Sequence, residues 1–232
     1  MSIKTRIKPL APIYRPVIGA FKGIARKKTY EGNPKAHWMK MGEGLTYEWA
    51  AKFDVSDQNK ILIEEIRKIN PTSLLEIGCG YGSRIKPIND ALKPEVYIGV
   101  DFASNQVIEG NKRLEGQGPK IIDADATKGL DFPDNSFDLV YTCGCLMHIP
   151  PKEMPKALRE VMRISKKWII HMEDLEKLPH YKYGYDFEKI YNDMGSRFAV
   201  TKSVILGMPK IKEKGLNVNK ENIKIIVVEK LM

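Results

Sequence analysis

Three glycines at alternate positions follow a short apolar segment, and they are the first feature of this 232-residue sequence that could do chemistry. Gly78, Gly80 and Gly82 come directly after Ser73–Ile77, a stretch typical of a buried strand. Glycine has no Cβ, so it adopts a positive φ without strain and lets backbone N–H groups approach a bound molecule. Glu76 stands two residues before the first glycine, where a carboxylate would repel a diphosphate and attract a cation. The pattern predicts a ligand-binding loop at a strand end.

This stretch resembles motif I of class I S-adenosylmethionine-dependent methyltransferases, whose usual form is Glu/Asp-x-Gly-x-Gly-x-Gly. Every fixed position is matched, whereas the dinucleotide fingerprint places its third glycine one residue later. The resemblance implies S-adenosylmethionine as the cofactor, bound by Glu76, Cys79 and the three glycines. A tight turn without a ligand is one alternative, and a dehydrogenase is the least favoured reading because the spacing and Glu76 oppose it.

A second carboxylate follows the next predicted strand. Val96–Val100 is apolar, and Asp101 comes directly after it. An acidic side chain at this place can accept hydrogen bonds from both ribose hydroxyls of a nucleoside. Asp101 therefore supports an adenosine-containing ligand without separating S-adenosylmethionine from NAD, and Phe102 is expected to contact the same ligand. An exposed strand-end carboxylate is the alternative.

The loop after the third predicted strand supplies the adenine candidates. In the family that the sequence resembles, a loop aspartate there accepts a hydrogen bond from the adenine amino group, and the next backbone N–H meets a ring nitrogen. Asp125 and Ala126 match those positions, while Asp123 is a competing carboxylate slightly out of register. The following segment, 132–141, is similar to the family's fourth-strand pattern Phe-x-Asp-x-Ser-Phe-Asp-x-Val, in which Asp138 is expected to anchor the strand start.

The loop after the fourth strand should border the methionine end of the cofactor, where the methyl group leaves. Cys143 is expected to contact the cofactor there. His148 is the near-neutral base in this loop, so it could accept a proton from a hydroxyl or amine. A packing or hydrogen-bonding histidine is the alternative. The three cysteines neither form a disulfide framework nor stand at metal-ligand spacing, and no metal is expected.

Three further residues are candidates for the acceptor side. Trp38 and Tyr47 precede the glycine loop, and in the resembling family the helices at this place commonly cover the cofactor and shape the acceptor pocket. His171 ends the predicted fifth strand, with Glu173 close behind it. Core or lid packing is the alternative for the aromatic residues.

Alternating predicted strands and helices must position all these residues. They predict an α/β fold with a mainly parallel sheet and helices on both faces. The resemblance implies that this is the Rossmann-like class I methyltransferase fold, with a seven-stranded sheet. Segments 199–206 and 223–228 should form a final antiparallel hairpin. We expect a basic N-terminal arm over 1–36, lid or cap helices over 37–70, and the S-adenosylmethionine-binding catalytic domain over 71–232.

The formal net charge of +9 is concentrated at the start of the chain. Residues 1–40 contain ten Lys/Arg and one acid, Glu31, and prolines including Pro34 are expected to break regular structure there. Such a block could bind an anionic partner, either nucleic acid or a membrane surface, or remain a solvated arm. No apolar run reaches the ~18 residues of a membrane span. Since the basic start also lacks the apolar core of a signal peptide, we expect a cytoplasmic protein.

The sequence therefore predicts a methyltransferase that modifies an oxygen or nitrogen of a small-molecule or sugar-like acceptor. In-line methyl transfer depends mainly on alignment, so few catalytic side chains are required. An RNA or other nucleic-acid methyltransferase that uses the basic arm is the first alternative, although no Asn/Asp-Pro-Pro-Tyr/Phe motif follows the fourth strand. A non-catalytic cofactor-binding or membrane-surface module is the second alternative.

Overall fold

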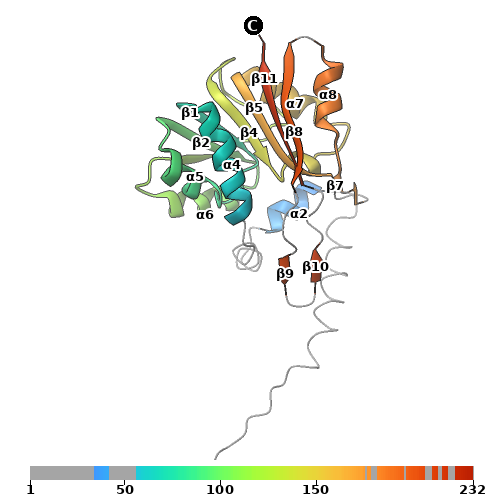
Figure 1. Ribbon diagram of the computed structural model, residues 1–232. Helices are drawn as coiled ribbons and strands as arrows, with labels where there is room; N and C mark the ends of the chain where they lie inside the picture. Colours follow the sequence, from blue (N-terminus) through green and yellow to red (C-terminus); the bar gives the residue numbers. More distant parts are fainter. Residues whose placement is uncertain are drawn as a thin grey trace, which may run out of the picture.

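A seven-stranded sheet lies at the centre of the computed structural model, which describes residues 34–41, 56–175, 177–178, 182–195, 197–206, 211–213, 216–218 and 223–231. The strand order is β3-β2-β1-β4-β5-β11-β8 (Figure 1). The strands are β1 (Ser73–Ile77), β2 (Val96–Asp101), β3 (Lys120–Asp123), β4 (Phe137–Cys143), β5 (Ser165–Asp174), β8 (Phe198–Leu206) and β11 (Ile223–Lys230).

The five strands from β1 to β5 are parallel, and β11 pairs antiparallel with both β5 and β8. This arrangement confirms the predicted fold class, including the final antiparallel pair. The connection between β8 and β11 contains a short hairpin of β9 (Ile211–Glu213) and β10 (Leu216–Val218), and a second hairpin pairs β6 (Lys177–Leu178) with β7 (Lys182–Tyr183).

Helices cover both faces of the sheet. The helices α4 (Ser56–Ile69), α5 (Ile85–Leu92) and α6 (Ser104–Leu114) pack into the core on one face, and α7 (Met154–Ile164) and α8 (Phe187–Asp193) pack into the core on the other. Figure 1 shows α4 crossing in front of the sheet. A parallel sheet needs this double cover because its strands are apolar on both sides.

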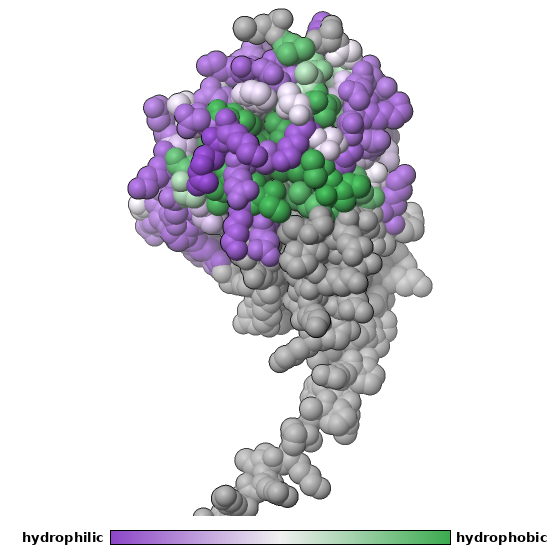
Figure 2. Space-filling model, in the orientation of Figure 1, coloured by the Kyte–Doolittle hydropathy of each residue, from purple (hydrophilic) through white to green (hydrophobic). Residues whose placement is uncertain are grey.

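The apolar side chains of α7 show how a helix packs against the sheet. Its buried side chains recur at helical spacing and face the sheet, and they are Met154, Ala157, Leu158, Val161 and Ile164. Burying each large apolar side chain stabilises the fold by about 2 kcal/mol. On the face seen in Figure 2, hydrophobic side chains near the middle are crossed by hydrophilic ones, and further hydrophilic side chains lie to the left and right. Within the described residues, no helix is both long enough and apolar enough to cross a bilayer.

Asp138 joins the amino ends of two central strands, as the sequence predicted. Its Oδ2 accepts hydrogen bonds from the backbone N–H of Thr72 at 3.0 Å and of Ser73 at 3.1 Å, and from the Thr72 hydroxyl at 2.7 Å. Partial burial alone would raise the pKa of Asp138, but these hydrogen bonds outweigh it and hold the pKa at about 2. The anchor therefore fixes β1 against β4.

The helix α2 (Pro34–Met41) departs from the expectation for the N-terminal region. Pro34 begins this helix instead of breaking the structure. An N–H group in the first helical turn has no acceptor within the helix, so the N–H that proline lacks is not missed there. The expected boundary between an arm over 1–36 and a lid over 37–70 therefore falls inside α2. Most of the basic arm lies outside the described residues, and so does Tyr47.

Candidate functional site

The carboxyl ends of the parallel strands meet at one edge of the sheet, and a cavity of about 400 Å³ opens there beneath α2. Following the sheet order, Asp125 follows β3, Asp101 ends β2, the glycine loop follows β1, and the loop 144–148 follows β4. Eight residues of the predicted site line the cavity: Trp38, Gly78, Gly80, Asp101, Phe102, Asp125, Ala126 and His148.

The glycine loop has the backbone that only glycine adopts without strain. Gly78 and Gly80 have φ values of 75° and 57°. A Cβ on Gly78 would lie 2.0 Å from Cys145 Sγ, so a side chain here would collide with the loop after β4. The backbone of the two loops is therefore packed together at the floor of the cavity.

Asp101 ties the glycine loop to the end of β2. Its Oδ2 accepts from the backbone N–H of Gly80 at 2.8 Å, and its Oδ1 accepts from the N–H of Ala103 at 2.9 Å. Burial raises the pKa of Asp101, and the backbone hydrogen bonds partly oppose that rise. The carboxylate is thus fixed in orientation at the wall of the cavity.

Asp125 is held by a residue of α2. Lys35 Nζ lies 2.7 Å from Asp125 Oδ2, 2.6 Å from Thr127 Oγ1 and 3.2 Å from Glu153 Oε2. The other oxygen of Asp125 accepts from the backbone N–H and the hydroxyl of Thr127. Partial burial would raise the pKa of Asp125, but the Lys35 and Thr127 hydrogen bonds outweigh it and lower the pKa. Lys35 was counted in sequence only as one of many basic residues.

The helix α2 is also hydrogen-bonded to the start of α6. The side-chain amides of Asn105 and Gln106 donate to the backbone carbonyls of Met39 at 2.6 Å and Trp38 at 3.3 Å. Further along the cavity, the Trp38 ring meets His148 edge to face with their centroids 4.9 Å apart. His148 is buried in the short 3₁₀ helix η1 (Leu146–His148). The helix therefore spans the cavity from Asp125 to His148.

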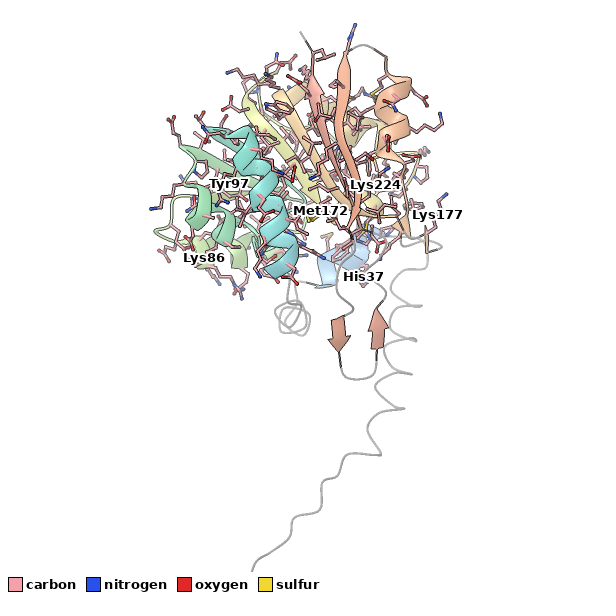
Figure 3. All side chains as sticks on the ribbon, viewed as in Figure 1. His37, Lys86, Tyr97, Met172, Lys177 and Lys224 are labelled. Atoms are coloured by element: carbon pink, nitrogen blue, oxygen red, sulfur yellow. The ribbon has the colours of Figure 1, made fainter. Side chains whose placement is uncertain are left out.

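Glu76 lies behind the glycine loop and is not among the residues that line the cavity. It is 1% exposed and accepts a 2.8 Å hydrogen bond from the Tyr141 hydroxyl, which in turn contacts the Tyr97 hydroxyl. Figure 3 labels Tyr97 beside α4. Burial raises the pKa of Glu76 to about 7, against the lowering effect of the Arg84 charge. Glu76 supports the loop through this buried network.

Cys79, Gly82 and Cys143 were also predicted to bind the cofactor, but they are not among the residues that line the cavity. Cys79 and Cys143 are buried free thiols in the core on the α4 face. A Cβ on Gly82 would lie 3.0 Å from an Ile121 methyl group, so Gly82 allows the loop to pack closely on β3. These residues shape the loops that carry the cavity-lining atoms.

His171 does not reach the acceptor side where the sequence placed it. Its ring is 0% exposed, stacks on Phe187 with centroids 4.6 Å apart, and forms hydrogen bonds to Thr142 and Tyr191. Burial lowers the pKa of His171 to about 3, so the ring is neutral at physiological pH. His171 is a core residue because α8 covers the face of β5 on which it lies.

The sequence did not single out several polar residues of the cavity wall, among them Lys35, Thr127, Gln106 and Glu153. Gln106 lies near the start of α6, and Glu153 precedes α7. Neither belongs to a motif, since the backbone brings them to the cavity only once α2 and the strand-end loops are assembled. The useful signal for Lys35 was Pro34, which is favoured in the first turn of a helix.

Comparison with known proteins agrees with this geometry. Residues 74–167 match the family model described as a methyltransferase domain. Phosphoethanolamine N-methyltransferase of Plasmodium falciparum is 26% identical over 113 residues, which are 49% of this chain and 41% of that protein. Phosphoethanolamine N-methyltransferase 2 of Caenorhabditis elegans is 31% identical over 117 residues, which are 46% of this chain and 26% of that protein.

Solved structures share the fold at low identity. Magnesium protoporphyrin IX methyltransferase of Synechocystis PCC 6803, solved with bound SAM, has a TM-score of 0.58 and 14% identity over 97% of this chain and 100% of that one. The present chain spans less than half the length of the two curated relatives described above.

Proposed function

We propose that the chain is a class I S-adenosylmethionine-dependent methyltransferase, which transfers the cofactor's methyl group to an oxygen or nitrogen of a small-molecule or sugar-like acceptor. The observation that carries the proposal is the cavity of about 400 Å³, which collects the strand-end loops of β3, β2, β1 and β4 beneath α2. Such a cavity has the size of a single small-molecule site.

The residues of the wall fit S-adenosylmethionine in the order of the strands. Asp125 and Ala126 would hold the adenine ring, and Asp101 the ribose hydroxyls. The close approach of backbone at Gly78 and Gly80 suits the narrower methionine chain. The bound cofactor supplies a methyl group activated by a positive sulfur.

His148 is placed to act on the acceptor. It lines the cavity at the end formed by the loop after β4, and Trp38 packs against its ring. A neutral imidazole there can take a proton from an acceptor hydroxyl or ammonium group. Trp38 shields this end from water, which keeps the acceptor's lone pair free to attack. Alignment of cofactor and acceptor within the cavity supplies the rest of the acceleration.

A small acceptor is favoured because α2 lies across the cavity. Its contacts through Lys35 and Trp38 leave a limited volume for the substrate. The relatives named for phosphoethanolamine methylation are consistent with a small acceptor. Binding of an anionic partner by residues 1–40 stays a prediction, and so does a cytoplasmic location.

Calorimetric titration tests the cofactor site. The chain should bind S-adenosylmethionine and S-adenosylhomocysteine but not NADH. Asp101→Asn should weaken both affinities about tenfold, because the amide replaces a charged acceptor. Asp90→Asn is the matched control, since Asp90 is an exposed residue of α5 paired with Lys86. NADH binding, or equal affinities in Asp101→Asn and the wild type, would contradict the assignment.

Transfer of a labelled methyl group tests the acceptor class. The panel should include phosphoethanolamine, small alcohols and amines, sugars and total tRNA. Label in one of the small molecules supports the proposal. Label in tRNA alone would replace it with nucleic-acid methylation.

A further inference from the structure

A buried chain of hydrogen bonds runs from α8 to the end of β5. The Tyr191 hydroxyl lies 2.8 Å from His171 Nε2, and His171 Nδ1 lies 2.9 Å from Thr142 Oγ1. Thr142 Oγ1 in turn lies 2.7 Å from Glu173 Oε1. All four side chains are buried, with Glu173 the most exposed at 2%.

The proton positions in this chain follow from its end. A carboxylate can only accept, so the single proton of the Thr142 hydroxyl points to Glu173. Thr142 must then accept from His171 Nδ1–H, and the other ring nitrogen accepts from the Tyr191 hydroxyl. The chain therefore has one direction, and each donor in it is used.

The Glu173 carboxylate also holds the loop after β4. It accepts from three successive backbone N–H groups, those of Cys145 at 3.3 Å, Leu146 at 3.2 Å and Met147 at 3.3 Å. His148 is the next residue, and Cys145 packs against Gly78. Figure 3 labels Met172, the residue of β5 that directly precedes Glu173. One buried carboxylate thus fixes the loop on which the cavity-lining Cys145 and His148 lie.

We infer that Glu173 is a positioning residue that shapes the methionine half of the cofactor site and leaves the adenosine half unaffected. The inference rests on the proposed function. The strand order supports the division, because β4 and β5 lie on one side of β1, while Asp101 of β2 and Asp125 after β3 lie on the other. Glu173 acts only through the loop, since it is not among the residues lining the cavity.

The substitution Glu173→Gln probes this role with little change in volume. An amide has one acceptor oxygen, and its NH₂ group donates. If the oxygen stays at the Thr142 side, the NH₂ group opposes the N–H of Met147, next to His148. If the amide turns over, the NH₂ group opposes the donors on Thr142, Cys145 and Leu146. Either orientation weakens the hold on the loop.

The test compares two ligands by calorimetry. S-adenosylhomocysteine contains the amino-acid chain, and 5′-methylthioadenosine lacks it. In Glu173→Gln the affinity for S-adenosylhomocysteine should fall about tenfold, while that for methylthioadenosine should change by less than about twofold. Asp138→Asn is the matched control, because Asp138 also accepts from successive backbone N–H groups but at the opposite ends of the strands. It should leave the ratio of the two affinities unchanged.

A second pair of variants covers the case in which Glu173→Gln fails to fold. Thr142→Val removes the hydroxyl, so it should lower the affinity for S-adenosylhomocysteine relative to that for methylthioadenosine. Thr142→Ser keeps the hydroxyl and should restore this ratio. An unchanged ratio in Glu173→Gln or Thr142→Val, or an equal loss for both ligands, would overturn the inference alone. A wild-type chain that binds neither ligand would overturn the proposed function together with it.

Discussion

The Lys35 ammonium lies 2.7 Å from the Asp125 carboxylate and so joins α2 to the loop after β3. One helical turn further on, Trp38 packs against His148 at the other end of the cavity. Within the part of the chain that the structure describes, the short helix α2 therefore contacts both ends of the cavity. The contacts at the Lys35 end are partly exposed, so they contribute about 1 kcal/mol or less.

Release of the bound nucleoside should depend on Lys35. Lys35→Met removes the ion pair but keeps an apolar stem of similar length, so dissociation of S-adenosylhomocysteine should become roughly three- to tenfold faster. Stopped-flow tryptophan fluorescence measures this rate. Lys60→Met, which breaks only the exposed pair with Asp57, is the control and should not change it. Equal rates in both variants would show that α2 does not limit release.

His148 should affect turnover more than cofactor affinity. His148→Gln removes the base, so methyl transfer to the acceptor found in the screen should fall roughly 10²-fold. Affinity for S-adenosylhomocysteine should stay within about threefold of the wild type. If His148→Gln transfers the methyl group at the wild-type rate at every pH from about 6 to about 9, His148 only packs against Trp38.

His171 should make the fold less stable in mild acid. Burial lowers its pKa to about 3, from an ordinary value of 6.5. Below pH 6.5 the unfolded chain binds a proton that the folded chain does not, so the stabilisation present above that pH is lost as the pH falls. The slope approaches about 1.4 kcal/mol per pH unit. Urea unfolding should show that the difference in free energy of unfolding between the wild type and His171→Gln decreases with this slope as the pH falls below 6.5.

Glu76 should have the opposite effect. Its pKa is raised to about 7 from an ordinary value of 4.5, so the folded chain holds a proton that the unfolded chain has released. Between these two values the contribution of Glu76 to the free energy of unfolding should fall as the pH rises. Glu76→Gln removes the titration, so the stability of this variant relative to the wild type should increase from about pH 5 to about pH 8. A constant difference across that range would contradict the raised pKa.

Gly78 should tolerate no side chain while Cys145 is present. Gly78→Ala would place a Cβ 2.0 Å from Cys145 Sγ at a φ of +75°, so binding of S-adenosylhomocysteine should be lost. Gly116→Ala is the matched control, because it has a φ of +73° with nothing within 4 Å of the added Cβ. The control should lose only about 1 kcal/mol of stability. Combining Gly78→Ala with Cys145→Gly should restore part of the binding.

The sequence predicted the sheet closely because most of its strands contain apolar runs, and β1 and β2 are each followed by a helical pattern. The positions of Asp101 and Asp125 followed from the same order, since carboxyl ends of parallel strands share one edge. Both residues line the cavity. Which motif residues face the cavity was harder to predict. Glu76 lies within β1, and alternation along the strand directs its side chain to the α4 face of the sheet. There the Tyr141 hydroxyl donates a hydrogen bond to it.

The remaining departures come from contacts between distant segments. His171 ends in the core because Phe187 and Tyr191 arrive from α8, and a strand-end histidine carries no sign of such a partner. Lys35 was assigned to an irregular arm because Pro34 was read as a breaker, although proline is equally at home in the first turn of a helix. Local patterns specify the elements, and long-range packing decides which of their residues share a cavity.

The tight fit of Gly78 against Cys145 has a consequence for how this sequence can vary. The two residues occupy one volume from two different loops, so a side chain gained at one position demands space given up at the other. A side chain at position 78 is therefore acceptable only together with a smaller residue at position 145, whereas residue 145 can become smaller alone. Descendants of this chain should keep a glycine at 78 for as long as residue 145 keeps a side chain there.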